Sequence, residues 1–171
     1  MNIFLKKYLS LGCFGIAITL LPEIAPDIAQ ADNVYANLPT LNSIVFVSSR
    51  GTSGTAIPLT ANAALALTSV GNVNVKSNTY LGFKVEVEST NNGLLKHSSG
   101  AGMAYNLNYN NADKGQITSK TVVEDNSALI TGCAGDTGCD RDVKISITQS
   151  EIQSKPAGLY SDTLTFTLTN K

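Results

Sequence analysis

The chain is poor in the residues on which most catalytic and metal sites depend. Only 15% of its residues are charged, its formal net charge is −1, and it has one histidine, His97, and no tryptophan. No run of lysine and arginine forms a basic patch of the kind that binds nucleic acid. The composition therefore predicts no nucleic-acid partner.

Catalytic motifs are missing as well. The sequence has no Gly-x-Ser-x-Gly elbow, phosphate-binding loop or His-Glu-x-x-His pattern. Glu86 and Glu88 share one face of an expected strand, but outward carboxylates on a charged strand are usually solvated. His97 lies in a Gly/Ser-rich stretch with no serine or cysteine motif near it. We therefore expect no catalytic residues, no cofactor and no enzymatic activity.

The N-terminal residues have the three parts of a secretory signal peptide. Two lysines precede an apolar stretch, 9–21, and Ala29 and Ala31 are small residues at the two positions that a signal peptidase reads. The apolar stretch is shorter than the ~20 residues of a membrane-spanning helix, and no later run approaches that length. We therefore expect a cleaved signal peptide, 1–31, no transmembrane segment in the mature chain, and export to the periplasm and then to the cell surface or medium.

Two cysteines remain after removal of this signal peptide, Cys133 and Cys139. An even number of cysteines in an exported chain favours a disulfide. The five residues between them are turn formers, which suits closure of a small ring. Their spacing does not match the usual zinc sites, and the nearby aspartates do not have the spacing of an EF-hand loop. We expect a disulfide and no metal.

Most of the mature chain alternates between apolar and polar residues, which indicates half-buried strands. The clearest alternating segments are 73–75, 81–87, 103–109, 143–147 and 160–168, with weaker strands expected at 121–123 and 128–130. The continuous apolar run Ile44–Val47 suggests a strand covered on both faces, and 57–69 fits a strand or a helix. Short strands at near-regular spacing predict an all-β domain, 43–171: an antiparallel immunoglobulin-like β-sandwich of seven to nine strands, or a small closed barrel.

The last of these segments is the most regular. Apolar Tyr160, Leu164, Phe166 and Leu168 share one phase, and threonines occupy most of the other. A chain end is usually frayed unless something holds it, so a strand this regular needs a neighbour on at least one edge. We expect these four residues to accept an added strand.

The extension 32–42 has a short pattern of its own. Val34, Ala36 and Leu38 share one phase, and Pro39 then interrupts it, as proline does where a strand ends. Two interpretations stay open. The stretch 32–41 inserts beside strand 160–169 of a neighbouring copy, or it is a disordered lead-in.

Four short motifs suggest a family. They are Gly-Phe-x-Val at 82–85, Ser-x-Asn-x-Gly at 89–93, Tyr-Asn-Leu-x-Tyr at 105–109, and Ala-Gly-x-Tyr-x-Asp-Thr-Leu-Thr at 157–165. With them, about 69–171 resembles the exported spore coat U-type domains, relatives of chaperone–usher pilins. The disulfide of pilins lies earlier in the domain than Cys133 and Cys139 do, so whether this domain is self-complete stays open.

The resemblance implies an immunoglobulin-like sandwich that lacks its last strand. In pilins a periplasmic chaperone fills the gap first, and the N-terminal extension of the next subunit fills it afterwards. The implied function is a structural subunit of a surface fibre or coat. Its partners would be other copies or related subunits, with a periplasmic chaperone and an outer-membrane usher as candidate assembly factors.

The alternative function is a stand-alone secreted or surface adhesin that binds glycans. Tyr105 and Tyr109 could stack on sugar rings in such a protein. They share their phase with Met103 and Leu107, however, which favours a place in the core.

Cleavage after Ala31 is directly testable. The exported protein should begin at Asp32, because the two small residues lie immediately before that position. N-terminal sequencing or intact mass of the exported protein measures this, and an exported chain that retains Met1 would contradict it.

Overall fold

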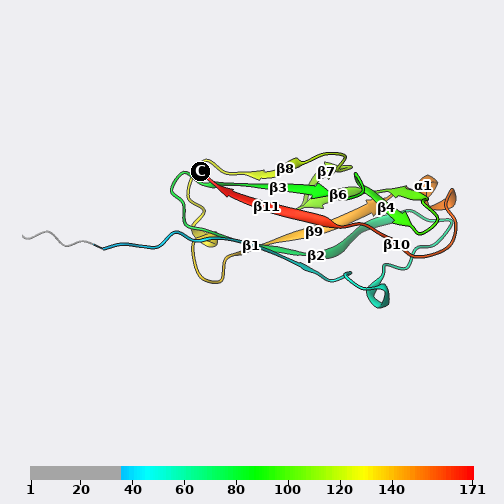
Figure 1. Ribbon diagram of the computed structural model, residues 1–171, viewed down its shortest axis with the longest axis horizontal. Coiled ribbons are helices and arrows are strands. Elements are labelled where there is room, and N and C mark those ends of the chain that lie inside the picture. The colour runs from blue at the N-terminus through cyan, green and yellow to red at the C-terminus, as the bar shows by residue number, and fades with distance from the viewer. Residues whose placement is uncertain (1–35) are drawn as a thin grey trace, which may run out of the picture. The chain divides into compact units, whose positions relative to one another are not determined.

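The computed structural model describes residues 36–171 (Figure 1). This part of the chain contains eleven strands, one α-helix and two 3₁₀ turns, joined by loops. In chain order these are β1 (Asn42–Ser48), η1 (Ser53–Thr55), β2 (Leu65–Ser77), β3 (Phe83–Ser89), β4 (Leu94–His97), β5 (Gly102–Ala104), β6 (Asn106–Tyr109), β7 (Ala112–Gly115), β8 (Thr121–Asp125), η2 (Thr131–Cys133), β9 (Cys139–Ile147), α1 (Gln149–Gln153), β10 (Tyr160–Ser161) and β11 (Leu164–Asn170). Residues 38–171 form one compact unit. No helix in this described part has the length and apolar character needed to cross a membrane. The expected signal peptide, with Ala29 and Ala31, lies outside the described residues.

Every strand pairing in the described residues is antiparallel. One sheet has the order β1-β2-β9-β6-β7, and two smaller sheets have the orders β11-β3-β8 and β10-β4-β5. The pair β10–β4 continues the pair β11–β3 beyond a short break in both strands. The expected all-β, antiparallel class is confirmed. Because breaks of this kind divide long strands into shorter ones, the described structure has eleven strands, whereas the sequence predicts seven to nine.

The segment 57–69, expected as a strand or a helix, is a strand only from Leu65 onward, and the weak strand expected at 128–130 is absent from the described structure. Residues 56–64 form neither strand nor helix, and β2 begins only at Leu65. Pro58 has no N–H to donate to a ladder, and Ala61 and Ala63 offer little apolar surface to bury. The weak strand expected at 128–130 is a loop. Ala128 and Leu129 are exposed there, and only Ile130 packs against the core.

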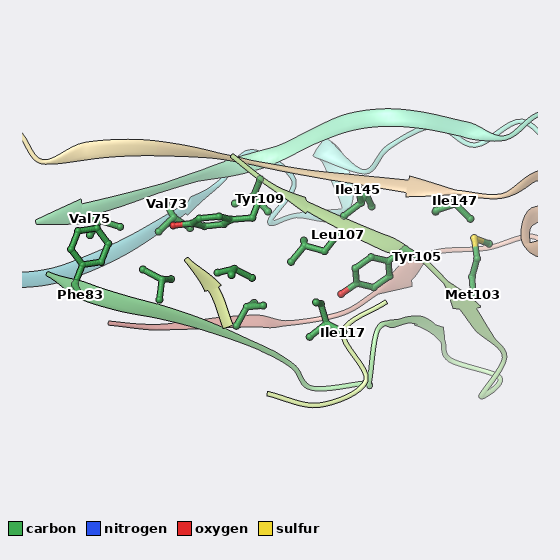
Figure 2. Packing of buried hydrophobic residues seen from close by; sticks show 14 of the residues in the cluster. Val73, Val75, Phe83, Met103, Tyr105, Leu107, Tyr109, Ile117, Ile145 and Ile147 are labelled. Atoms are coloured by element: carbon green, nitrogen blue, oxygen red, sulfur yellow. The ribbon is translucent and has the colours of Figure 1, made fainter. Parts of the chain in front are cut away.

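The core lies between the five-stranded sheet and the β11-β3-β8 sheet, as Figure 2 shows. The inward-facing residues of the alternating strands supply most of this core. Its largest fully buried side chains are those of Tyr109, Phe83, Leu107, Ile117, Val73, Val75, Val85, Val87 and Val143. Tyr105 and Tyr109 are both buried, which confirms their expected place in the core. Their side chains are therefore not exposed on the outer surface.

β1 is covered on one face only, contrary to the expectation from its continuous apolar run. Ile44 and Phe46 pack against the core, whereas Val45 and Val47 are 51% and 64% exposed. β1 pairs with β2 alone and ends its sheet. An edge strand of a two-layer arrangement has one inward face, so every second apolar residue faces outward.

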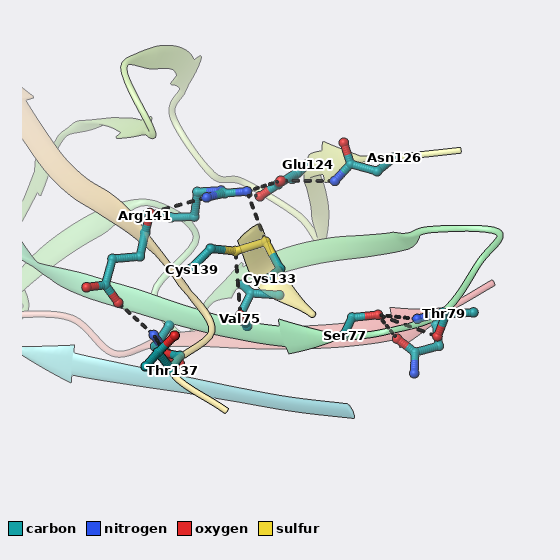
Figure 3. The surroundings of a disulfide bond; sticks show 12 residues. Val75, Ser77, Thr79, Glu124, Asn126, Cys133, Thr137, Cys139 and Arg141 are labelled. Atoms are coloured by element: carbon teal, nitrogen blue, oxygen red, sulfur yellow. Dashed lines mark hydrogen bonds and ion pairs between the residues drawn. A yellow bond between two sulfur atoms is a disulfide. The ribbon is translucent and has the colours of Figure 1, made fainter. Parts of the chain in front are cut away.

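The expected disulfide between Cys133 and Cys139 is present (Figure 3). The two Cα atoms are 4.6 Å apart, within the normal range. The bridge ties η2 to the first residue of β9. Because the closed loop is short, we expect it to stabilise the domain by only ~2 kcal/mol.

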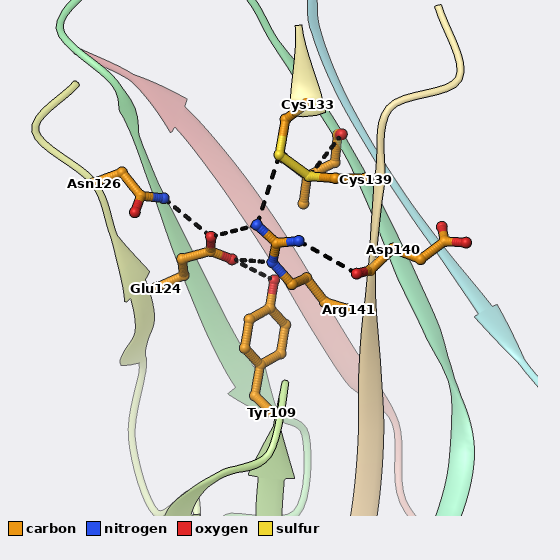
Figure 4. A network of polar contacts seen from close by, with 8 residues as sticks. Tyr109, Glu124, Asn126, Cys133, Cys139, Asp140 and Arg141 are labelled. Atoms are coloured by element: carbon orange, nitrogen blue, oxygen red, sulfur yellow. Dashed lines mark hydrogen bonds and ion pairs between the residues drawn. A yellow bond between two sulfur atoms is a disulfide. The ribbon is translucent and has the colours of Figure 1, made fainter. Parts of the chain in front are cut away.

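Beside this disulfide, Arg141 and Glu124 form a largely buried ion pair that joins β9 to β8 (Figure 4). Arg141 Nε and Nη2 donate to the carboxylate at 2.9 and 2.8 Å, and Nη2 also lies 3.6 Å from Cys133 Sγ. Tyr109 Oη and Asn126 Nδ2 donate to the same carboxylate at 3.1 and 3.0 Å. Burial by itself raises the pKa of Glu124. The hydrogen bonds and the arginine charge outweigh it, so the pKa of Glu124 lies below its usual value.

Replacing Glu124 should destabilise the domain in a pH-dependent way. Glu124→Gln leaves the Arg141 charge without its counterion, and we expect a loss of about 2–3 kcal/mol in the free energy of unfolding at neutral pH. The carboxylate stabilises the fold above its unfolded pKa, and this contribution is lost as pH falls below about 4.5. The stability difference from wild type should therefore shrink in acid.

Chemical denaturation at several pH values measures this difference. The matched control is Glu88→Gln, because Glu88 is an exposed carboxylate on β3. A Glu124→Gln variant as stable as the Glu88→Gln variant at pH 7 would contradict the role of the ion pair.

Candidate functional site

A cavity of about 900 Å³ lies beside the β10 end of β11. We call it the apolar groove. Its floor consists of the buried residues Met103, Tyr105, Ile145, Ile147 and Ile152, four of which are labelled in Figure 2. Phe46 and Val70 belong to one wall and Leu164 to the other, while 50–59 and 155–163 form the rim. The floor is therefore the continuation of the core.

The groove is bordered by two strands that each have an unpaired edge in the described structure. β1 pairs only with β2, and β11 pairs only with β3, so each ends its sheet. A strand edge presents a row of N–H and C=O groups that can pair with another chain. Backbone donors and acceptors thus lie above an apolar floor, which is the combination that an added β-strand needs.

At one end β1 and β11 close on each other. The rings of Phe46 and Phe166 have their centroids 5.1 Å apart, and Asn170 Nδ2 donates to the Leu41 carbonyl at 3.3 Å. Phe166 and Leu168 lie on the closed side of this contact, packed against the core, and do not line the groove. The groove is therefore open toward β10 and closed at the Phe46–Phe166 contact.

A single carboxylate holds the break between β10 and β11. Asp162 Oδ2 accepts hydrogen bonds from Ser89 Oγ and Tyr105 Oη, both at 2.6 Å. Its Oδ1 accepts from the backbone N–H groups of Asn91 and Thr163, at 3.1 and 2.8 Å. These bonds fix the breaks in both strands, β3–β4 and β10–β11, and so set the position of the groove wall.

Tyr105 connects this network to the groove floor. Burial first, and then the hydrogen bond to Asp162, raise the pKa of the Tyr105 phenol. The phenol therefore stays protonated at all ordinary pH values and donates to the carboxylate. Its hydroxyl is already committed to Asp162, so the ring offers the groove an apolar surface.

Contacts of Tyr160 and Gly158 hold the rim of the groove next to β10. Tyr160 Oη donates to the Pro156 carbonyl at 2.6 Å, and the Tyr160 and His97 rings have their centroids 5.1 Å apart. Gly158 has a φ of +150°, and a Cβ there would lie 2.2 Å from His97 Nε2. Only glycine fits this position, which explains the Ala-Gly pair before the final strand.

Of the four residues expected to accept a strand, Tyr160 and Leu164 line the groove, whereas Phe166 and Leu168 do not. Of the three candidate donor residues, Ala36 and Leu38 are exposed, and Val34 lies outside the described residues. Carboxylate and imidazole groups do not gather at the groove. Residues 36–171 contain no group of three or more histidine, cysteine, aspartate or glutamate residues placed to hold a metal ion.

Sequence reasoning missed Phe46, Met103 and Asp162 as parts of one site. The apolar pattern of a strand does not show whether its edge is paired, because pairing is decided by strands far away in the sequence. One signal was present. Asp162 occupies the inward phase between Tyr160 and Leu164, where a charged residue needs buried partners.

No family model matches the chain, and no curated protein sequence matches it at a significant level.

Removing the Asp162 carboxylate should destabilise the domain strongly. Asp162→Ala leaves the Tyr105 and Ser89 hydroxyls and two backbone N–H groups without their acceptor, and we expect a loss of about 2–4 kcal/mol in the free energy of unfolding. Chemical denaturation measures it. The control Asp136→Ala, in an exposed loop, should change stability by less than about 0.5 kcal/mol. Equal stability of both variants would show that the carboxylate does not hold the strand breaks.

Proposed function

We propose that the protein is an exported structural subunit of a surface fibre or coat, with an incomplete immunoglobulin-like sandwich that is completed by β-strand addition. The observation that carries this proposal is the apolar groove between the unpaired edges of β1 and β11. Main-chain hydrogen bonds to the edges would supply affinity, and side chains of one phase would enter the groove. The role requires no catalytic chemistry.

The closed end of the groove determines the direction of the added strand. The Phe46–Phe166 contact blocks one end, so an N-terminal segment enters through the mouth near β10 with its N-terminus leading. β11 runs from this mouth toward Asn170. The added strand therefore runs antiparallel to β11 and parallel to β1.

The donor in this proposal is the segment 32–38 of another copy. Residues 39–41 are not free to insert, because Asn78 Nδ2 donates to the Pro39 carbonyl and Leu41 N–H donates to Asn78 Oδ1, both at 2.8 Å. These bonds hold the segment near the closed end of its own groove. Insertion of a chain into its own groove would have to pass the Phe46–Phe166 contact, so the groove suits a neighbour's segment. Before assembly, a periplasmic chaperone would cover the same edges.

Two variants of equal charge test whether the N-terminal segment is a donated strand or only a disordered lead-in. Val34→Asp with Ala36→Asp places charges in the phase that would enter the apolar groove, and should abolish multimers of the exported protein. The control, Asn33→Asp with Asn37→Asp, adds the same charge in the opposite phase and should still assemble.

Size-exclusion chromatography with light scattering reports the outcome. Deletion of 32–38 should also leave monomers or chaperone-bound subunits, and it preserves the Pro39 and Leu41 hydrogen bonds. Equal assembly of both charge variants, or a wild-type protein that is a stable monomer without any chaperone, would refute strand donation.

A further inference from the structure

One end of the domain carries an exposed apolar cluster that the groove does not use. Tyr80, Leu81 and Leu129 are 82%, 59% and 38% exposed, and we call these three residues the end patch. Single exposed apolar residues are normal on a protein surface. Several on adjoining loops mark an interaction surface.

The loops that carry the end patch are held together. Asn78 Nδ2 donates to the Pro39 carbonyl at 2.8 Å, which joins the lead-in to the β2–β3 turn. Gly82, at the end of that turn, lies under the loop after β8, since a Cβ there would come within 2.3 Å of the Asn126 carbonyl oxygen. The three side chains therefore belong to one end of the domain, where β1 begins and β8 ends (Figure 1).

The other end of the domain offers an apolar counterpart. Loop 155–159 forms part of the groove mouth, and Leu159 on it is 54% exposed, beside exposed Pro156 and Ala157. This loop is fixed by Gly158 against His97 and by the Tyr160 hydrogen bond to Pro156. Pro156, Ala157 and Leu159 thus lie on one side of the place where an added strand would enter.

We propose that the end patch of one copy docks on loop 155–159 of the next copy, an inference that rests on strand donation as the proposed function. Pro39 is anchored to its own domain, and the inserted segment lies just upstream of it. The inserted segment ends at Leu38, immediately before Pro39, and one extended residue spans only about 3.5 Å. A segment seated in the groove therefore brings the donor's end patch against the acceptor's groove mouth.

The two surfaces differ, so the contact is head-to-tail. Each copy presents the end patch at one end and loop 155–159 at the other. Such a heterologous contact repeats from copy to copy, and it builds an open filament unless the rotation closes a ring. The contact would limit bending at each junction, because the linking chain is too short to separate the domains.

Site-directed crosslinking of the full exported chain tests this contact. Ala128→Cys lies beside Leu129, and Ala157→Cys lies beside Leu159; both alanines are small and exposed. The double variant, treated with a short bismaleimide, should give a ladder of covalent multimers on a denaturing gel. The control pairs Ala157→Cys with Val122→Cys, an exposed residue on β8 away from the end patch, and should give no ladder.

A second variant tests the energetic role of the patch. Tyr80→Ser with Leu81→Ser should raise the concentration needed for half-assembly roughly tenfold, because exposed aromatic and aliphatic anchors contribute most at such contacts. Val122→Ser should leave it unchanged. A synthetic peptide of residues 32–38 should bind the Tyr80→Ser, Leu81→Ser variant as tightly as the wild type, since the groove is intact.

The outcomes separate the two proposals. Wild-type multimers by light scattering, with no ladder from the Ala128→Cys and Ala157→Cys pair, would overturn the end-to-end contact and leave strand donation standing. Absence of wild-type multimers would overturn strand donation, and the end-to-end contact with it.

Discussion

The backbone of an edge strand must find hydrogen-bond partners, and this constraint governs the structure more than any single side chain does. β1 and β11 each end a sheet, and they lie next to each other at the surface of one core. Where Phe46 and Phe166 meet, side chains close the space between them. Beyond that contact the strands diverge, and apolar floor is left beside unpaired backbone. In the described residues, the unpaired edges of β1 and β11 thus lie beside this apolar floor.

Asp162 lies beside the groove, at the break between β10 and β11. A charged residue in the inward phase of a strand must be paired, and here two hydroxyls and two backbone N–H groups satisfy it. The same bonds interrupt the pairing of both strands, so that β10 and β4 continue beyond the break as a separate pair. The polar network of Asp162 therefore lies at the rim of an apolar groove, next to Leu164 of its wall.

Much of the fold was predictable, because the alternation of apolar and polar residues along a strand indicates which side chains are buried. The inward phases of 103–109 and 143–147 are buried as expected, and Cys133 pairs with Cys139. The inward phase of 81–87 is buried except for Leu81, which precedes β3 and is 59% exposed. Edge position was not predictable. Val45 and Val47 look like core residues in the sequence, and only the absence of a covering layer exposes them. Leu164 and Phe166 are two residues apart and share one phase. For the same reason, the sequence could not show that Leu164 lines the groove whereas Phe166 closes its end.

Amide hydrogen exchange tests the central claim, that β1 and β11 are edges completed by another chain. In each strand every second amide points to the unpaired edge and should exchange rapidly in the unassembled subunit. On assembly, these edge amides in Val45–Ser48 and Tyr160–Leu164 should gain protection of about tenfold or more, while Val85–Val87, already paired on both sides, should not change. Equal exchange of the edge amides before and after assembly would contradict the account, because no strand would then have been added at the groove.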